Sequence, residues 1–408
     1  MATPTASIEF APFAAGFDAD PFPIYRRLRE EEPLHYWAAA PGWVVTRHED
    51  VAVVIRDSRF SLNLWDWEHA PRQPPMEERS LFERLMARGT FQVQDQDHAR
   101  LRKLVSHALT PRAVDRMSEE VQVITDEVIE SHASSGAEIN LYHIADPIPL
   151  RVISRFLGIP RDQETAFRRF GVSIIEASNP VLTEEQRAEV LVPFDEGVAM
   201  LEEVIDHRRR HLGEDFLSGL ILAEEEGQRL SKEELIALVQ ALVAAGSDTT
   251  VYAICFAVLD LLRHPDQLQL VLDDPAMARA AFEESLRYDY VLKVGNGHYC
   301  REELTLCGRT FHKGELIMPG MIGALRDPSV FPSPDTFDIR RDVSQSVAFG
   351  GGPHYCMGAA LARLEGAVVI ASLFRRFPHM QLAGEPSFSP SYIMRAITGL
   401  PIRLGRPS

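Results

Sequence analysis

The sequence predicts a mainly α fold with a minor β portion, built as a single large domain with a long central helix. Three observations predict this fold class. Helical periodicity with cap signals covers most of the chain, strand signals are few and clustered, and no linker, internal repeat or low-complexity block divides residues 1–408. A composition of 45% hydrophobic and 25% charged residues is ordinary for a globular protein.

Prolines and glycines predict where two of the helices begin and end. Pro111 stands at a first helical position, and the periodic run that follows it should stop at Ser134–Gly136. Another helix should begin near Pro147 and continue to Gly158.

The longest predicted helix lies in the middle of the chain. Ser231 and Glu234 form a capping box, and apolar residues continue to the His-Pro pair at 264–265, which predicts a helix over about 231–264. At 1.5 Å per residue this helix is roughly 50 Å long, enough to cross a large domain. Gly246 lies in its interior beside hydroxyl residues, and such a sequence favours a local break in the hydrogen-bond ladder.

Strand signals are confined to three places. Trp43–Thr46 is one predicted strand, and Leu304–Cys307 with Leu316–Met318 predicts a hairpin around Gly308 and Gly314. The segment 380–404 is punctuated by proline and glycine and should form short strands.

Charge and cysteine usage exclude several classes of protein. A net charge of −17 repels phosphate backbones, so no nucleic-acid partner is expected. Four cysteines are too few for a disulfide framework in 408 residues, and the chain has no CxxC or HExxH motif. The amino terminus does not resemble a secretory signal, and no apolar run is long enough to suggest a membrane span. We therefore expect a cytoplasmic monomer.

The stretch FGGGPHYCMG, residues 349–358, places Cys356 just before a predicted helix. Free N–H groups and the dipole at a helix start favour a thiolate, and glycines allow the backbone to approach a flat or bulky group. A structural cysteine would not need three consecutive glycines. A phosphate loop would not carry Pro353, and His354 with Cys356 does not match a zinc spacing. A thiolate axial ligand to haem is the remaining candidate.

This stretch closely resembles the haem-binding loop of the bacterial cytochrome P-450 family, Phe-Gly-x-Gly-x-His-x-Cys-x-Gly, and the resemblance extends over nearly the whole chain. It implies the cytochrome P-450 fold and haem b, which is iron protoporphyrin IX. It makes Cys356 the iron ligand. The other expected haem-binding residues of the loop are Phe349, Gly350, Gly358 and His354.

Two further motifs extend the resemblance. Asp248 and Thr249 in AGSDTT look like the family's acid–alcohol pair, which implies that Asp248 relays protons and Thr249 provides a catalytic hydrogen bond. Glu284 and Arg287 are similar to the family's ExxR pair, with Arg341 as the third member of a triad that braces the haem core.

The resemblance also implies contacts to the haem propionates. His98 and Arg102, four residues apart on one helix face, occupy positions where the family has propionate ligands, and His354 should reach a propionate as well. The family usually has an arginine where this chain has His298, so this contact should be weaker, pH-dependent or replaced.

By resemblance, the chain is a haem-thiolate monooxygenase that inserts one atom of dioxygen into a C–H bond, by hydroxylation or epoxidation. Its electrons should come from a ferredoxin and an NAD(P)H-dependent ferredoxin reductase. Its substrate should be a lipophilic terpenoid, steroid, fatty acid or polyketide. Lys293 either pairs with a substrate carboxylate or, as we expect, extends its ammonium group to solvent. The expected pocket residues are Leu242, Ala245, Val291, Val294 and Ile397.

Two alternatives remain open at this point. A peroxide-driven peroxygenase or isomerase would be expected to lack the acid–alcohol pair, which this sequence retains as Asp248 and Thr249. A non-catalytic haem sensor would have no use for that pair and usually carries a signalling domain. Both alternatives are therefore less favoured than the monooxygenase.

Overall fold

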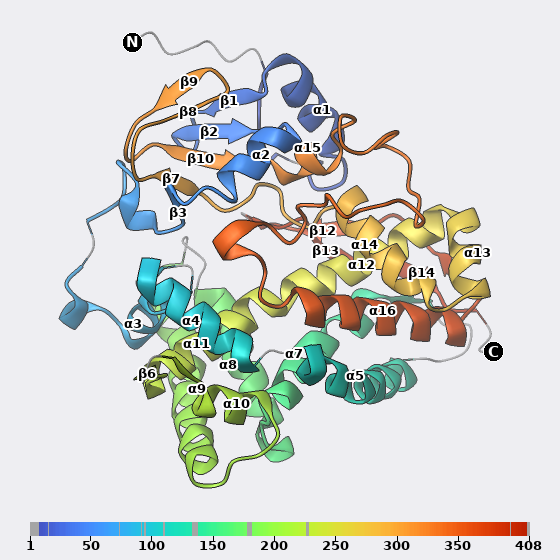
Figure 1. Cartoon of the computed structure of the whole chain (residues 1–408). Helices are drawn as coiled ribbons and strands as arrows, with labels where there is room; N and C mark the ends of the chain where they lie inside the picture. The colour runs from blue at the N-terminus through green and yellow to red at the C-terminus, as the bar shows by residue number, and fades with distance from the viewer. Residues whose placement is uncertain are drawn as a thin grey trace. The chain divides into compact units, whose positions relative to one another are not determined.

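The computed structural model describes residues 8–14, 16–72, 74–90, 92–93, 95–108, 111–132, 138–177, 182–225, 228–391 and 393–405. The chain forms two compact units. Unit 1 comprises Met1–Pro71, Ile129–Ala145 and Thr249–Ser408, and unit 2 comprises Arg72–Val128 and Asp146–Asp248. Helices predominate and the strands are short (Figure 1), so the predicted mainly α fold with a minor β portion is confirmed. That the two units form one domain stays a prediction.

Unit 1 contains the β-sheets other than the β5–β6 pair, and the helices that flank the cysteine loop. Its helices are α1 (Phe22–Glu31), α2 (His48–Val54), α6 (Tyr142–Ala145), α12 (Asp248–Arg263), α13 (Pro265–Asp273), α14 (Met277–Tyr288), α15 (Met321–Leu325) and α16 (Ala359–Arg376). Short 3-10 helices occur at η1 (Leu64–Asp66) and η4 (Gly352–His354). Helix α14 packs against α16, which follows the cysteine loop directly.

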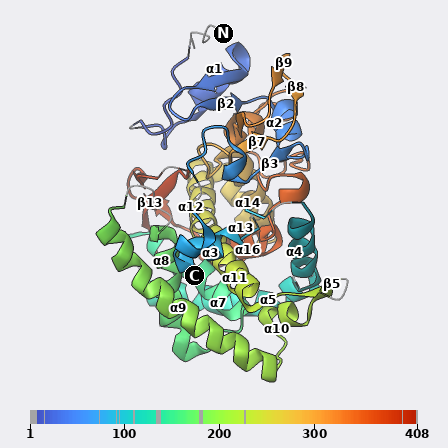
Figure 2. The ribbon, with the colours of Figure 1, turned by 90° about the vertical axis from the view of Figure 1, so that its left-hand side faces the viewer.

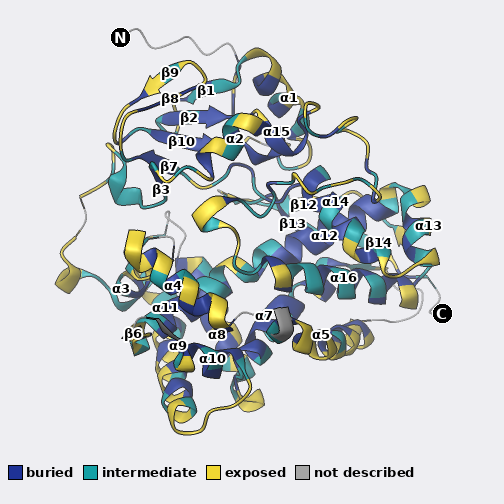
Figure 3. Cartoon of the chain, viewed as in Figure 1, coloured by how far each residue is buried: buried dark blue, intermediate teal, exposed yellow. Residues whose placement is uncertain are grey.

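The largest sheet has the strand order β1-β2-β10-β7-β3. Its strands are β1 (Leu34–Trp37), β2 (Gly42–Val45), β3 (Phe60–Ser61), β7 (His298–Cys300) and β10 (Leu316–Pro319). Strands β2 and β10 are parallel, with Ile317 opposite Trp43, and the other pairs are antiparallel. The core side chains Val44, Val45 and Ile317 are fully buried, and Figure 3 shows these central strands as mostly buried.

The predicted hairpin between residues 304–307 and 316–318 is wrong. Strand β8 (Leu304–Leu306) pairs instead with β9 (Arg309–Phe311), while β10 pairs with β2 and β7. The reason is the two-residue turn at Cys307 and Gly308, whose φ angles are +50° and +72°. Positive φ at both positions is typical of the tight turn that best matches the twist of paired strands.

The other strands of unit 1 are short, as expected for residues 380–404. They are β4 (Glu138–Asn140), β11 (Gln381–Leu382), β12 (Ser387–Ser389), β13 (Ala396–Gly399) and β14 (Pro401–Arg403). Strand β14 joins β11 and β4 in one sheet, and β12 pairs with β13.

Unit 2 is almost entirely helical. Its elements are η2 (Met76–Glu78), α3 (Leu81–Ala87), α4 (Asp95–Ala108), most of α5 (Pro111–His132), α7 (Pro147–Phe156), η3 (Arg161–Gln163), α8 (Glu164–Ala177), α9 (Glu184–Arg210), α10 (Phe216–Leu222), β5 (Glu224–Glu225), β6 (Gln228–Arg229) and α11 (Lys232–Gly246). Helices α8 and α9 lie side by side (Figure 2). A Cβ at Gly197 would lie 2.4 Å from the Phe170 ring, so this packing requires glycine.

The helices predicted from Pro111 and Pro147 are present as α5 and α7, although residues 133–137, where the first was expected to stop, lie outside the described residues. The predicted central helix is two helices, α11 and α12, which meet at Ser247. Ser247 has ψ −80°, and both its amide and its hydroxyl bond to the carbonyl of Val243. The Ser247 hydroxyl thus competes with the backbone amide for the Val243 carbonyl. The sequence around Gly246 predicted such a local break in the helical hydrogen bonds.

The stretch Lys232–Arg263 is the one place in the described chain with the length and apolar character of a membrane-crossing helix. However, 67% of its most apolar window is buried inside the protein. A helical stretch that is apolar on all sides and mostly buried by the rest of the protein is typical of the core of a large protein.

Candidate functional site

The loop 349–358 is held in a closed shape by its own backbone. The Cys356 amide donates to the Phe349 carbonyl at 2.9 Å, and the Gly350 amide donates to the Val347 carbonyl at 2.7 Å. Gly350 and Gly352 have φ angles of +74° and +57°, which side chains disfavour. The two inner hydrogen bonds and the two left-handed glycines turn the chain so that Cys356 stands at the end of the loop.

Close packing adds a second reason for glycine in this loop. A Cβ at Gly352 would lie 2.8 Å from the Arg56 Cα, which is backbone and cannot move aside as a side chain does. A Cβ at Gly358 would meet only the Cys356 Sγ, at 4.0 Å. Gly352 therefore allows the Arg56 backbone to approach the loop closely, and Gly358 leaves space beside the Cys356 sulfur.

The Cys356 thiol is exposed, and α16 begins three residues later. A helix start carries partial positive charge, which favours the thiolate form. Burial, and secondly the charge of Cys356, raise the pKa of Tyr290, whose hydroxyl donates to the Ala348 carbonyl at 2.9 Å. An accessible sulfur at a helix start, with bare backbone around it, fits a thiolate ligand to the iron of a flat haem group.

Arg363, which the sequence reasoning missed, holds the loop from the next turns of α16. Its guanidinium lies 4.3 Å from the centre of the Phe349 ring and donates to the Tyr355 hydroxyl at 3.1 Å. Its other bonds go to the carboxylate of Glu283 on α14. An arginine in a mostly apolar helix gives no signal of such a contact in a single sequence.

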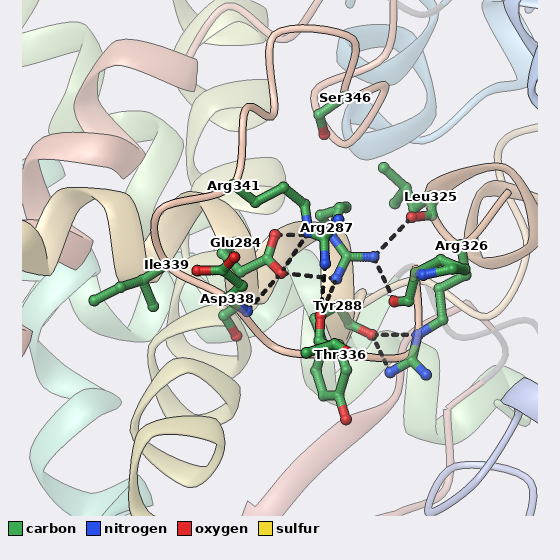
Figure 4. Close-up of polar contacts among 12 residues, drawn as sticks. Glu284, Arg287, Tyr288, Leu325, Arg326, Thr336, Asp338, Ile339, Arg341 and Ser346 are labelled. Carbon is green, nitrogen blue, oxygen red and sulfur yellow. Dashed lines mark hydrogen bonds and ion pairs between the residues drawn. The ribbon is translucent and has the colours of Figure 1, made fainter. Parts of the chain in front are cut away.

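Glu284, Arg287 and Arg341 form one ion-paired cluster (Figure 4). The Arg287 guanidinium meets the Glu284 carboxylate through two bonds of 2.7 and 2.8 Å, and Arg341 Nε meets the same carboxylate at 3.1 Å. Glu284 also accepts from the Asp338 amide at 3.0 Å. This cluster joins α14 to the segment that leads into the cysteine loop. Its role in bracing a haem core stays a prediction.

Asp248 and Thr249 lie at the start of α12, directly after the break at Ser247. Both side chains are partly buried. Burial, and secondly the negative charge of Asp146, raise the pKa of Asp248 to about 6. A carboxyl group with this pKa can hold and release a proton near neutral pH.

His98 and Arg102 lie one turn apart on α4, as predicted from their spacing. His98 is buried, and its pKa is lowered by burial and by the charge of Arg102. Arg100 on the same helix forms an ion pair with Glu234, the acid of the capping box that begins α11. This pair fixes α4 against the start of α11 within unit 2.

His298 is buried in β7, and its Nδ1 lies 2.8 Å from the Asn296 carbonyl. Burial lowers the pKa of His298 to about 4, so the ring is neutral at physiological pH. With its proton on Nδ1, the neutral ring presents Nε2 as an acceptor. His298 could therefore donate to a propionate only as the imidazolium, which its surroundings disfavour. His354 is partly buried at the end of η4.

The expected pocket residues differ in burial. Val291, Val294 and Ile397 in unit 1 are buried, whereas Leu242 is partly exposed and Ala245 is exposed on α11 in unit 2. An isolated bridge between Leu292 and Met394 joins the two segments of unit 1 that carry the first three.

Lys293 does not reach solvent, contrary to the prediction. Its side chain is 3% exposed and its Nζ lies 2.9 Å from Asp18 Oδ1. Its backbone carbonyl accepts from the Tyr25 hydroxyl, and its amide donates to the Ile393 carbonyl at 2.7 Å. Asp18, far away in sequence, provides the buried counter-charge that the ammonium group needs.

A cleft of about 740 Å³ lies beside the cysteine loop in unit 1. Four arginines line it, namely Arg56, Arg279, Arg341 and Arg363. Arg341 and Arg363 are paired with Glu284 and Glu283. The sequence did not predict this cleft, because its residues come from four separate segments.

Comparison with known proteins agrees with the site. Residues 192–391 match the family model "Cytochrome P450". An epothilone C/D epoxidase of Sorangium cellulosum is 41% identical over 98% of this chain and 96% of its own length. A vitamin D(3) 25-hydroxylase of Pseudonocardia autotrophica is 33% identical over 99% of this chain and 98% of its own length. The solved structure of epothilone D-bound Cytochrome P450epoK, 40% identical, superposes with a TM-score of 0.89 over 98% of this chain and all of its own.

Proposed function

The chain belongs to the cytochrome P-450 family, and from this premise we propose that Cys356 is the thiolate ligand of its haem. Members of the family are monooxygenases that bind haem through a cysteine thiolate. The observation that supports Cys356 is its exposed sulfur on the glycine loop at the start of α16. Of the other cysteines, Cys255 and Cys300 are buried, and Cys307 lies in the β8–β9 turn.

Bound haem supplies the oxidising chemistry, since a thiolate ligand increases electron density at the iron and favours O–O cleavage. The protein supplies orientation and protons. Asp248 holds a proton on a carboxyl group whose pKa is about 6. Thr249, the next residue in α12, provides a hydroxyl group. The break in helical geometry at Ser247 separates the first turn of α12 from the regular backbone hydrogen bonds of α11.

Histidine and arginine side chains would hold the two propionates of the haem. His354 on η4, and His98 with Arg102 on α4, are the proposed ligands. His298 is a weaker candidate, because its neutral ring cannot donate from Nε2 while Nδ1 is bonded to Asn296. Phe349, Gly350 and Gly358 would shape the backbone on the sulfur side.

The reaction proposed is insertion of one oxygen atom into a C–H or C=C bond of a lipophilic molecule. The buried side chains Val291, Val294 and Ile397 in unit 1 provide apolar surface for this molecule. Leu242 and Ala245 on α11 are also proposed as pocket residues, on the strength of the family resemblance. Epoxidation is included because the relative from Sorangium cellulosum is an epoxidase. We also propose that the protein is a cytoplasmic monomer.

The test of the cysteine assignment is the absorption spectrum of the reduced, carbon monoxide-bound protein. Thiolate ligation shifts the main haem band to the long wavelength that characterises the family. Cys356→Ser should abolish this band, and Cys307→Ser, which alters the other exposed cysteine, should leave it unchanged. The same band in Cys356→Ser would overturn the proposal.

A ferredoxin is the proposed electron donor, and the arginine-lined cleft beside the cysteine loop is its proposed docking place. Arg56 and Arg279 line this cleft, where they suit the carboxylates of an acidic protein. Arg279→Gln should raise the ferredoxin concentration needed for half-maximal reduction, most strongly at low salt. Arg27→Gln, on α1 and paired with Glu31, is the matched control. Equal effects of the two variants would contradict docking at the cleft.

A further inference from the structure

Asp18, in the amino-terminal segment before α1, contacts two segments that lie far from it in the sequence. Its Oδ1 lies 2.9 Å from Lys293 Nζ, and its backbone carbonyl accepts a hydrogen bond from Arg395 Nε at 2.7 Å. The side chains of Lys293 and Arg395 are 3% and 1% exposed, so both cations are buried. One residue thus binds the buried cations of two separate segments of unit 1.

The segments 291–294 and 393–397, which carry these two cations, also carry the proposed pocket residues of unit 1, namely Val291, Val294 and Ile397. Backbone hydrogen bonds join the two segments. The Lys293 amide donates to the Ile393 carbonyl at 2.7 Å. The Arg395 amide donates to the Val291 carbonyl, also at 2.7 Å. A shift of either segment therefore moves apolar side chains on both.

The two cations depend on Asp18 to different degrees. Arg395 also forms an ion pair with Asp289 and donates to the Tyr290 carbonyl at 3.1 Å. Lys293 has no second ion pair among the residues that the structure describes. A buried ammonium group without a counter-charge is strongly unfavourable, so loss of the Asp18 carboxylate should displace the Lys293 side chain and the backbone that carries it.

We propose that Asp18 is a positioning residue for the substrate pocket, which holds the segments 291–294 and 393–397 in place through Lys293 and Arg395. This inference rests on the proposed pocket residues, and it extends the determinants of substrate binding to the amino-terminal segment. Asp18 acts through the backbone of the two segments rather than by touching the substrate. Its carboxylate holds Lys293, and its carbonyl, which a substitution does not remove, holds Arg395.

The first test is the binding of two iron-coordinating probes to the haem-bound protein, measured by the shift of the haem absorption band. Imidazole is small, whereas phenylimidazole adds a ring that must contact the apolar wall of the pocket. Asp18→Asn should weaken phenylimidazole binding by about tenfold, within the range for residues coupled through a backbone shift, and leave imidazole binding unchanged. Asp20→Asn removes an exposed charge two residues away and should change neither affinity. Wild-type affinity for phenylimidazole in Asp18→Asn would overturn the proposal.

A double variant separates this positioning role from a contribution to stability alone. In Asp18→Asn the Lys293 ammonium group is left without its counter-charge, so the free energy of unfolding should fall. Asp18→Asn combined with Lys293→Met removes both charges and should restore the free energy of unfolding, because apolar residues often replace a buried ion pair without loss. The link between the segments stays absent, so phenylimidazole binding should remain weakened. Recovery of both quantities together would show that Asp18 acts only through stability, and the proposal would fail.

Val294→Ala distinguishes failure of this inference from failure of the pocket assignment. This variant removes two methyl groups from the proposed pocket wall and should weaken phenylimidazole binding. If Val294→Ala weakens it while Asp18→Asn does not, the pocket assignment stands and the inference about Asp18 fails. If neither variant changes it, the pocket assignment fails and the inference fails with it.

Discussion

The Arg287 guanidinium and the Glu284 carboxylate form a two-bond ion pair in which the side chains are 0% and 1% exposed. Arg287 also donates to the carbonyls of Pro334 and Leu325 at 2.8 and 3.1 Å. A buried pair of charges is favourable only when further hydrogen bonds satisfy both groups. Here backbone carbonyls do so for the cation, and an amide and a second arginine do so for the anion (Figure 4).

Glu284→Gln should strongly destabilise the protein. The change leaves Arg287 and Arg341 facing a neutral amide, and removal of one partner of a buried pair typically costs about 3–5 kcal/mol. Denaturant unfolding of the haem-bound protein measures the loss. Glu31→Gln breaks the exposed Arg27–Glu31 pair on α1 and should have no measurable effect. If Glu284→Gln lowers the free energy of unfolding no more than Glu31→Gln does, the cluster does not contribute to stability.

Thr249→Ala should separate electron consumption from product formation. The variant keeps the fold but removes the hydroxyl group beside Asp248, so reductant should be consumed with less product and more hydrogen peroxide. Thr249→Ser restores a hydroxyl group and should recover much of the coupling. The measurement is the ratio of product to reductant oxidised, and an unchanged ratio in Thr249→Ala would refute the role given to this residue.

Asp248→Asn should lower the rate of product formation by about 10²-fold, the lower end of general acid–base contributions. The amide cannot donate the carboxyl proton that Asp248 holds. In the wild-type protein this supply should diminish as pH rises above about 6, and the variant should lack that pH dependence. Steady-state rates of product formation, measured from below to above about pH 6, test both the size of the loss and its pH dependence. If Asp248→Asn shows the same decrease in rate with rising pH as the wild-type protein, another group is responsible for the titration.

Elements fixed by local signals could be predicted from the sequence. The capping box of Ser231 and Glu234 is present at the start of α11, and Pro111 and Pro147 begin α5 and α7. Each signal acts within one turn of helix, so neighbouring residues suffice to identify it. The motif at 349–358 was equally local, and it led to the correct family.

Features that depend on distant partners could not be predicted. Whether Leu316–Pro319 pairs with β8 or with β2 depends on which strand the tertiary fold brings to it. The burial of Lys293 depends on Asp18, which is distant in sequence.

His298 should make the protein more sensitive to acid. Its pKa is lowered from 6.5 to about 4 by burial, so the unfolded chain binds a proton on His298 more readily than the folded one does. The contribution of the neutral His298 to the free energy of unfolding is therefore fully present above about pH 6.5. It falls as pH decreases toward 4, by up to about 1.4 kcal/mol per pH unit. His298→Gln should reduce this fall, measured by unfolding between these limits. The exposed His69→Gln is the control. A wild-type protein that gains stability on acidification would instead indicate a charged His298 facing a propionate.

Gly352→Ala should disturb the cysteine loop, whereas Gly358→Ala should be tolerated by the fold. At Gly352 an added methyl group meets the Arg56 Cα at 2.8 Å in a backbone with φ +57°, which should cost about 1–3 kcal/mol. At Gly358 the φ angle is −81° and the methyl group meets only the Cys356 Sγ at 4.0 Å, an ordinary contact.

The two glycine variants therefore separate the two uses of glycine in the loop. Gly352→Ala should lower both the free energy of unfolding and the haem content after purification, because the turn that presents Cys356 is strained. Gly358→Ala should keep near-normal stability but shift the haem absorption band, since the methyl group lies beside the sulfur. Denaturant unfolding and the absorption spectrum of each variant measure the two effects. If Gly352→Ala retains full stability, the backbone around Arg56 must be able to yield, and the close approach would not be the reason for glycine at this position.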